Sequence, residues 1–241
     1  AAMAGHGLRS GDDYTGLVAR AAVLSIPEGT GIAEAADRAS AVLADRIGLP
    51  REHVTERFLE TGSLWIQPSD DHPTATPIAL FEAIDDDLLV IVRASTGISI
   101  PVTWGGSGER VNALFFLAGT TVNPGRSLRL AGELAGFLHS GARMVGRAMT
   151  EEEVKTALLP DLSVRQYALL PEGHDAGLIG HRIAELVFPD GVEVAAVTRF
   201  GVVLPVEPDL VLEADDHLTV FGPEEVMPSA GEPVPVAYPD R

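Results

Sequence analysis

The sequence predicts a layered α/β domain followed by a small α+β module. Segments with strand-like and helix-like patterns alternate over residues 17–160, which is typical of an α/β layer fold. Residues 161–226 instead contain short β-branched segments separated by turns rich in Pro, Gly and Asp. We interpret the polar, Gly-rich residues 1–16 as a linker and the Pro-rich residues 227–241 as a flexible tail.

Composition narrows the class of protein. The chain of 241 residues carries a formal net charge of −18, which argues against nucleic acid as a direct partner because a phosphate backbone would be repelled. It contains no Cys, so neither a disulfide framework nor a thiolate metal site is expected. No apolar run reaches the roughly twenty residues of a membrane span, and no signal peptide is recognisable. We expect a soluble, cytoplasmic segment with no direct membrane insertion.

The first half of the α/β domain begins with a predicted strand at 18–26. Thr30 is the expected N-cap of the helix that follows, and Gly48 is its expected stop. A second, charged helix is predicted over Arg51–Glu60, with Val54 and Phe58 facing inward. The buried face of the first helix is marked by one apolar stripe, which comprises Ile32, Ala35, Ala36, Ala39, Val42, Leu43 and Ile47.

The second half of this domain contains two predicted buried strands, at 88–93 and 111–117. Residues 85–87 are three aspartates, which we interpret as a solvent-exposed turn. Ser127 is placed as the N-cap of the next helix, and Thr150 with Glu153 forms a capping-box pattern at the start of the last one. The apolar stripe expected on the helix after Ser127 comprises Leu128, Ala131, Leu134, Ala135 and Leu138.

The C-terminal module is predicted to contain one helix and three strands. The helix is expected at 178–187, because apolar residues recur there at a spacing of three to four. Strands are predicted at 192–199, 202–206 and 217–221, and Pro205 marks the second as an edge or exit strand. An acidic turn at 213–216 precedes the last strand.

The order of these motifs resembles the TrkA-C (RCK_C) domain. The segment has Gly180 to Leu186, the Pro189-Asp190-Gly191 turn, Arg199 and Gly201 at the hairpin, Pro205 in the next strand, and finally Ala214-Asp215-Asp216-His217-Leu218. Ala214 replaces the Gly that is usual in the family. The resemblance implies a dimerising, ligand-sensing domain attached to ion or solute transporters. In several relatives the dimer cleft binds cyclic di-AMP.

The preceding region has a fainter resemblance to the fructose/mannitol-type EIIA domain of the sugar phosphotransferase system, which implies a mixed sheet with flanking helices. The family's phosphorylated His follows an Ile-Pro dipeptide, and here Pro77 is followed by Ile78. The position of the family's second His is taken by Ser127. Neither side chain can serve as the nucleophilic imidazole that phosphoryl transfer through a protein needs. We therefore expect a scaffold that carries no phosphate and acts in interaction or sensing.

Arg199 is the first candidate ligand-binding residue. It precedes Gly201 at a strand end, where a guanidinium could bind a phosphate through two hydrogen bonds. The resemblance implies that Val203, Leu204 and Pro205 supply an apolar shelf. His181, near the start of the predicted helix, could join an anionic site, and its alternative is a surface residue. The alternative is that Arg199 pairs with Glu193 or Glu207 in a purely structural dimer, and the sequence leaves both open.

His72, within Asp70-Asp71-His72-Pro73, is the candidate for a displaced phosphohistidine or a metal ligand. Its alternative is an exposed acidic turn. No zinc-type spacing, phosphate loop or Ser-His-Asp order is present. We therefore predict neither a catalytic residue nor a metal site, and no cofactor other than a regulatory nucleotide.

These observations predict the regulatory region of a bacterial cation (K⁺ or Na⁺/H⁺) or amino-acid transporter. It would be the cytoplasmic part of an inner-membrane protein and a homodimer formed through the TrkA-C module. Its partners would be the membrane domain of the parent transporter and a small molecule such as cyclic di-AMP. The alternative function is an active phosphocarrier that uses His72.

Overall fold

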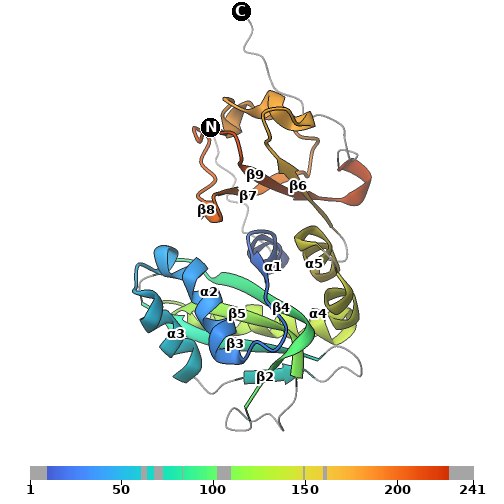
Figure 1. The fold of residues 1–241 in the computed structure, drawn as a ribbon. Coiled ribbons are helices and arrows are strands. Elements are labelled where there is room, and N and C mark those ends of the chain that lie inside the picture. Colours follow the sequence, from blue (N-terminus) through green and yellow to red (C-terminus); the bar gives the residue numbers. More distant parts are fainter. Residues whose placement is uncertain are drawn as a thin grey trace, which may run out of the picture. The chain divides into compact units, whose positions relative to one another are not determined.

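The computed structural model describes residues 10–60, 64–67, 73–82, 84–101, 110–148, 150–159 and 162–227. The chain forms two compact units, Ala1–Val154 and Lys155–Arg241, which are treated separately below. Figure 1 shows a helix-flanked sheet in the first unit and a smaller sheet in the second.

The first unit is built on a five-stranded sheet in the order β1-β4-β5-β3-β2. Strands β1 and β4 are parallel, as are β3 and β5, whereas the pairs β4–β5 and β2–β3 are antiparallel. The expectation of a mixed sheet is therefore confirmed. The strands are β1 Ala22–Ser25, β2 Leu64–Gln67, β3 Thr74–Phe81, β4 Leu88–Ser99 and β5 Arg110–Thr120.

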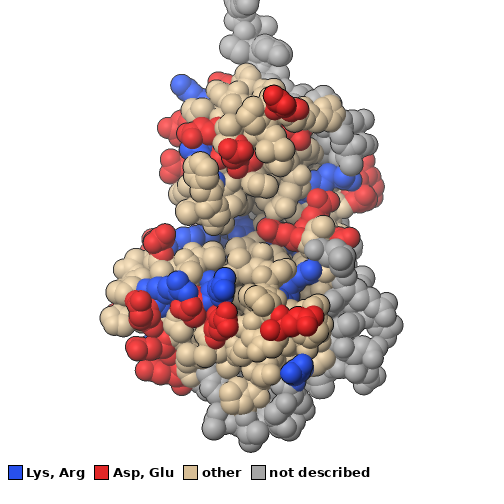
Figure 2. Space-filling view, viewed as in Figure 1, with Lys and Arg blue, Asp and Glu red and all other residues tan. Residues whose placement is uncertain are grey.

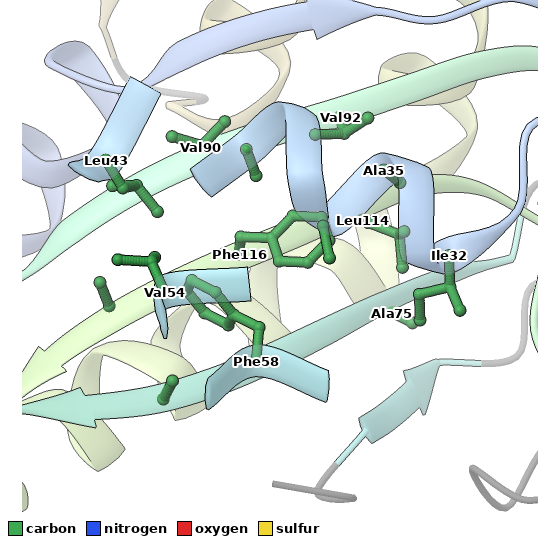
Figure 3. Close-up of a cluster of buried hydrophobic side chains, with 14 of the residues drawn as sticks. Ile32, Ala35, Leu43, Val54, Phe58, Ala75, Val90, Val92, Leu114 and Phe116 are labelled. Atoms are coloured by element: carbon green, nitrogen blue, oxygen red, sulfur yellow. The ribbon is translucent and has the colours of Figure 1, made fainter. Parts of the chain in front are cut away.

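Helices lie on both faces of this sheet. Helices α2 (Ile32–Ile47) and α3 (Arg51–Glu60) contact β3, β4 and β5 from one side, and α4 (Pro124–Arg147) contacts β5, β3 and β2. Figure 3 shows Phe58 of α3 beside Phe116 of β5, with Leu43 and Val54 close by. The Phe58 ring meets the Phe116 ring edge to face, with centroids 5.2 Å apart. The inward positions predicted for α3 are confirmed.

The predicted C-terminal end of α2 is correct, and its predicted N-cap is wrong. Gly48 is the C-cap at φ 72°, a left-handed conformation that Gly adopts without strain, and its N–H donates to the carbonyl of Ala44 at 2.8 Å. The N-cap is Gly31, not Thr30. The Thr30 hydroxyl donates instead to the Pro27 carbonyl at 2.6 Å, so it closes the preceding turn.

The expected linker over residues 1–16 is wrong in its second part. Helix α1 spans Ser10–Ala19, which also displaces the start of the first predicted strand to Ala22. The helix forms because Tyr14, Leu17 and Val18 share one face and are buried. The Tyr14 ring stacks on Phe137 of α4 at a centroid distance of 4.7 Å. Burial, and then the charge of Glu133, raise the pKa of the Tyr14 phenol.

The second unit holds a four-stranded antiparallel sheet in the order β6-β9-β7-β8. Its strands are β6 Ser163–Ala168, β7 Glu193–Arg199, β8 Val202–Leu204 and β9 His217–Gly222. The three predicted strands are confirmed, although the second ends before Pro205, and β8 is an edge strand as expected. Strand β6 was missed. Helix α5 (Glu151–Leu158) precedes it and carries the predicted Thr150–Glu153 capping box.

The helix predicted at 178–187 is wrong. The segment contains only short 3-10 turns, η2 (His174–Leu178) and η3 (Ile183–Glu185); a third, η4 (Glu224–Val226), follows β9. Gly180 has φ 88°, and its N–H donates to the Leu212 carbonyl at 2.8 Å, while the Leu212 N–H donates to the His181 carbonyl at 2.9 Å. The apolar spacing is used all the same, because Ile179, Ile183 and Leu186 pack against the core of this unit.

Candidate functional site

The hairpin that joins β7 to β8 has a two-residue tip, Phe200-Gly201, since Arg199 pairs directly with Val202. The φ angles of the tip are 50° and 82°, the signs that a type I′ turn requires at both central residues. Gly201 meets this demand without strain, whereas a left-handed conformation costs a bulky side chain roughly 1–2 kcal/mol. Phe200 is also 84% exposed. Phe200 at the tip therefore combines a strained backbone conformation with a solvent-exposed aromatic side chain.

Arg199, directly before the tip, is held in an ion pair with Asp216, the residue that precedes β9. Its Nε and Nη2 donate to the two carboxylate oxygens of Asp216, each at 2.8 Å. Nη1 donates to Glu213 at 2.6 Å, and Nη2 also donates to the Val211 carbonyl at 2.9 Å. Asp216 and Glu213 thus take the place of Glu193 and Glu207, which the sequence offered as partners. The predicted role of Arg199 in ligand binding stays a prediction.

Asp216 lies in the acidic turn that was predicted at 213–216. Its side chain is completely buried, and the Glu213 N–H donates to its Oδ2 at 2.8 Å. Burial acts to raise the pKa of this carboxyl, but the hydrogen bonds from Arg199 and the Glu213 amide, with the charges of Arg199 and His217, bring the pKa below its usual value. The same pairing, led by the hydrogen bond to Asp216, raises the pKa of Arg199. Both groups are therefore charged at neutral pH.

A shallow pocket of about 220 Å³ follows β8 and is lined by Leu204, Pro205, Glu207, Asp209 and Leu210. Two residues of the predicted apolar shelf, Leu204 and Pro205, belong to this lining, and Val203 does not. The two carboxylates of the lining were not anticipated. Figure 2 shows acidic side chains at several points on the displayed face of this unit.

His181 lies next to the acidic turn through the backbone but forms a pair of its own. Its Nδ1 is 2.9 Å from Oε2 of Glu185, and its side chain is 32% exposed. The hydrogen bond with His181, followed by that from the Arg182 amide, lowers the pKa of Glu185. The structure therefore brings the backbone of His181 to Leu212, the residue before Glu213, while its side chain bonds to Glu185.

The first unit offers a different polar cluster at the position where the EIIA family has its second His. Ser127 is fully buried within α4, whose first residue is Pro124, so the predicted N-cap is wrong. Its hydroxyl donates to Oδ1 of Asp87, which is buried rather than part of an exposed turn. Arg126 pairs with Asp86 at 3.0 Å and with Asp87 at 3.5 Å. Gly119 makes room for the hydroxyl, because a Cβ there would lie 2.5 Å from the Ser127 oxygen.

The apolar face of α4 differs from the predicted stripe. Leu130, Ala131, Leu134 and Leu138 are buried, whereas Leu128 is 63% exposed. The difference follows from Ser127, which points inward together with Leu130 and Ala131 and so turns Leu128 to solvent.

Other predicted features of the first unit have different outcomes. Ile78 is half-buried in β3. His72 lies outside the described residues. Within the described ranges, no group of three His, Asp or Glu side chains could hold a metal ion, and none of the helices is long and apolar enough to cross a membrane.

Comparison with known proteins supports the resemblance of the C-terminal module to the TrkA-C domain. Residues 168–232 match the model of the TrkA-C domain family. No curated protein matches the chain. The solved structures that match the chain include two IIA proteins, both with TM-scores below 0.5. The nitrogen regulatory protein IIA-Ntr from Neisseria meningitidis is 18% identical with a TM-score of 0.49, covering 58% of this chain and 94% of that one. A PTS IIA protein (PtxA) from Streptococcus mutans is 14% identical with a TM-score of 0.40, covering 60% and 91%.

Proposed function

We propose that this chain is a regulatory, ligand-sensing region that controls a bacterial transporter of cations, K⁺ or Na⁺/H⁺. The alternative parent protein is an amino-acid transporter. The region dimerises through its TrkA-C module and binds a small molecule next to β8, and ligand binding changes the relation of the two copies and so the activity of the membrane domain. The observation that carries this proposal is the TrkA-C match at 168–232.

The geometry beside β8 supports a ligand site there. Leu204, Pro205 and Leu210 give the pocket an apolar wall against which a planar ring can pack, and its volume of about 220 Å³ is open to solvent on one side. Arg199 lies at the other end of β8, since it pairs with Val202. An apolar wall with a guanidinium at the other end of the same strand is a combination that suits a nucleotide such as cyclic di-AMP.

The charges set a condition on a phosphorylated ligand. The bidentate pair with the buried Asp216 occupies Nε and Nη2 of Arg199, while Nη1 is occupied by Glu213, whose side chain is 58% exposed. Glu213 can therefore move into solvent and leave Nη1 to a phosphate without uncovering Asp216. The carboxylates of Glu207 and Asp209 oppose the same phosphate, so binding should strengthen as the salt concentration rises.

Calorimetric titration of the whole chain with cyclic di-AMP tests the ligand, with ATP and AMP as controls. Glu213→Gln should strengthen binding severalfold because it removes the competitor for Nη1. Pro205→Asp should weaken it because it adds a negative charge to the pocket. Saturable binding at one ligand per dimer, with these two opposite responses, supports the proposal. If no nucleotide gives heat, cyclic di-AMP is excluded as the ligand. The proposal would then be limited to a dimer that couples two transporter copies.

The regulatory role has a separate test. The chain would be assayed together with the membrane domain of its parent transporter in vesicles, with rubidium flux as the measure for a K⁺ system and pH-driven Na⁺ flux for an antiporter. Flux that changes when the chain is removed supports regulation. Flux that is the same with and without the chain contradicts it, whatever the titration gives.

A further inference from the structure

We propose that Glu207 and Asp209 bind the amino group of a nucleobase that enters the pocket walled by Leu204, Pro205 and Leu210. The site therefore selects nucleotides whose base carries an exocyclic amino group. The inference rests on the nucleotide site proposed above. It specifies which end of the ligand lies in the pocket and which bases the pocket accepts.

The first step is that the two carboxylates belong to a rigid turn. Glu207 and Leu210 close this turn, since the Leu210 N–H donates to the Glu207 carbonyl at 3.0 Å. Pro208 lies between the two acids, and its ring fixes its φ angle. The turn is also bonded to η3, because the Pro208 carbonyl accepts from the Ala184 N–H at 2.9 Å and the Leu210 carbonyl accepts from the Ile183 N–H at 3.0 Å. The backbone that carries both acids is therefore held in place before a ligand binds.

The second step is that both carboxylates are acceptors without donors. Within the described ranges, the side chains of Glu207 and Asp209 form neither a hydrogen bond nor an ion pair. The neighbouring acids Glu213 and Asp216 differ in this respect, because both accept from Arg199. The described residues that line the pocket also include no basic side chain. A ligand in the pocket therefore meets two unused acceptors.

The third step is that the pocket and Arg199 lie on the same face of the sheet. Side chains two residues apart on a strand share a face, and so do directly paired residues of neighbouring strands. Leu204 therefore shares its face with Val202 and with Arg199, which pairs with Val202. Arg199 also donates to the carbonyl of Val211 at 2.9 Å, and Val211 follows Leu210 of the pocket lining. The guanidinium and the carboxylates can therefore contact different ends of one ligand.

The charges then determine the orientation of a nucleotide. Its phosphate is repelled by Glu207 and Asp209 and attracted by Arg199. Its base is left to the pocket, where the ring packs on the apolar wall and an amino group donates to a carboxylate. Adenine and guanine both carry such a group. Hypoxanthine lacks it and presents a carbonyl oxygen where adenine has the amino group, so two acceptors would face each other.

Calorimetric titration of the whole chain with three cyclic dinucleotides tests the base selectivity. Cyclic di-AMP, cyclic di-GMP and cyclic di-IMP share one ribose–phosphate ring, and among them only cyclic di-IMP lacks an exocyclic amino group. We expect cyclic di-IMP to bind roughly tenfold more weakly than the better of the other two, because a site built for an N–H donor rejects the analogue without it. Cyclic di-IMP that binds as tightly as both other ligands would overturn the inference.

The double variant Glu207→Gln/Asp209→Asn tests which residues read the base. Loss of the two charges removes the repulsion of the phosphates equally for all three ligands, so by itself it changes their affinities together. The ratio between the affinities for the amino-bearing ligand and for cyclic di-IMP responds only if the acids contact the base. It should fall to about twofold or less, because an amide side chain also donates to the hypoxanthine carbonyl.

The matched control is Glu172→Gln/Asp190→Asn. It removes two exposed carboxylates of the same unit that lie outside the pocket lining, so the affinity ratio should stay unchanged. A ratio that falls in the control as well would assign the effect to net charge and overturn the contact of Glu207 and Asp209 with the base.

The remaining outcomes separate this inference from the proposed function. Nucleotide binding whose selectivity survives in the Glu207→Gln/Asp209→Asn variant would overturn the base contact and leave the nucleotide site intact. If none of the three dinucleotides gives heat, the base contact and the nucleotide site are both excluded.

Discussion

Two buried aspartates, Asp216 in the second unit and Asp87 in the first, receive their hydrogen bonds in different ways. Asp216 accepts two bonds from Arg199 and one from the Glu213 amide, each at 2.8 Å. Asp87 accepts one from Ser127, while its Oδ2 lies 3.5 Å from Nε of Arg126 and makes no hydrogen bond within the described ranges. Asp216 therefore receives hydrogen bonds from a charged side chain, whereas Asp87 receives its hydrogen bond from a neutral hydroxyl and has Arg126 only as a more distant ion-pair partner. That difference predicts how each site responds to substitution.

Arg199→Ala should give the largest effect, a loss of roughly 3 kcal/mol in the unfolding free energy of the second unit, because it leaves the Asp216 charge buried and unpaired. Urea unfolding of the whole chain measures it. The matched control is Arg165→Ala, since Arg165 has a similar exposure but its partner Glu224 is 3.9 Å away and 70% exposed. Equal losses of unfolding free energy in the two variants would contradict the claim that the buried charge of Asp216 causes the larger loss.

Ser127→Ala should cost about 1–3 kcal/mol in the unfolding free energy of the first unit, because a buried acceptor loses its hydroxyl donor. The same urea experiment measures it in the other transition. Leu128→Ala is the control, because Leu128 is exposed on the same turn of α4 and should change stability little. If Ser127→Ala were neutral, Asp87 would have to be satisfied by water in place of the hydroxyl.

Acid should separate wild type from Arg199→Ala. The folded-state pKa of Asp216 is below its usual value, so its stabilisation is present above a carboxyl pKa of about 3.9 and is lost as the pH falls through the lower folded value. In Arg199→Ala burial is opposed only by the Glu213 amide and the charge of His217, so the pKa of Asp216 rises and protonation relieves the variant. The stability difference should shrink from pH 7 to pH 3 in urea unfolding. A difference independent of pH would mean that lost packing, not lost charge, destabilises the variant.

Glu213→Gln should have the smallest effect on folding, a change of about 0.5 kcal/mol or less, because its contact with Arg199 is solvent-exposed and the Asp216 pair remains. Thermal unfolding measures it. A loss as large as that of Arg199→Ala would show that Glu213 is part of the buried pair. It would also disqualify the variant for the nucleotide titrations.

The spacing of apolar residues predicted correctly those helices that bury a single face against the core. The apolar stripes of α2 and α3 were read correctly, because the residues of each stripe are buried in the core of the first unit. The segment at 178–187 has the same spacing, but its backbone bonds to Leu210 and Leu212 and not to itself. Tertiary hydrogen bonds overruled the periodicity there. Helix α1 was missed because its polar first residues hide the buried face of Tyr14, Leu17 and Val18.

The sequence predicted which residues lie together at the hairpin, but it did not predict the hydrogen-bond partners of Arg199. Arg199, Leu204 and Pro205 were named correctly as neighbours of one hairpin, because a motif at a tight turn is local. The partner of Arg199 was missed, since Asp216 is brought to it by the pairing of Thr198 with His217 across β7 and β9. One signal was available. Two consecutive aspartates precede β9, and Asp215 takes up the turn at φ 68°, which leaves Asp216 to point inward.

The pair between Arg199 and Asp216 also has a mechanical consequence. It ties the last residue of β7 to the residue that precedes β9, next to the hairpin tip. A force applied to Phe200 therefore cannot bend the tip as a loose loop. The force is transmitted through the Arg199–Asp216 pair to β9, an interior strand of the sheet. The pair therefore resists bending of the hairpin.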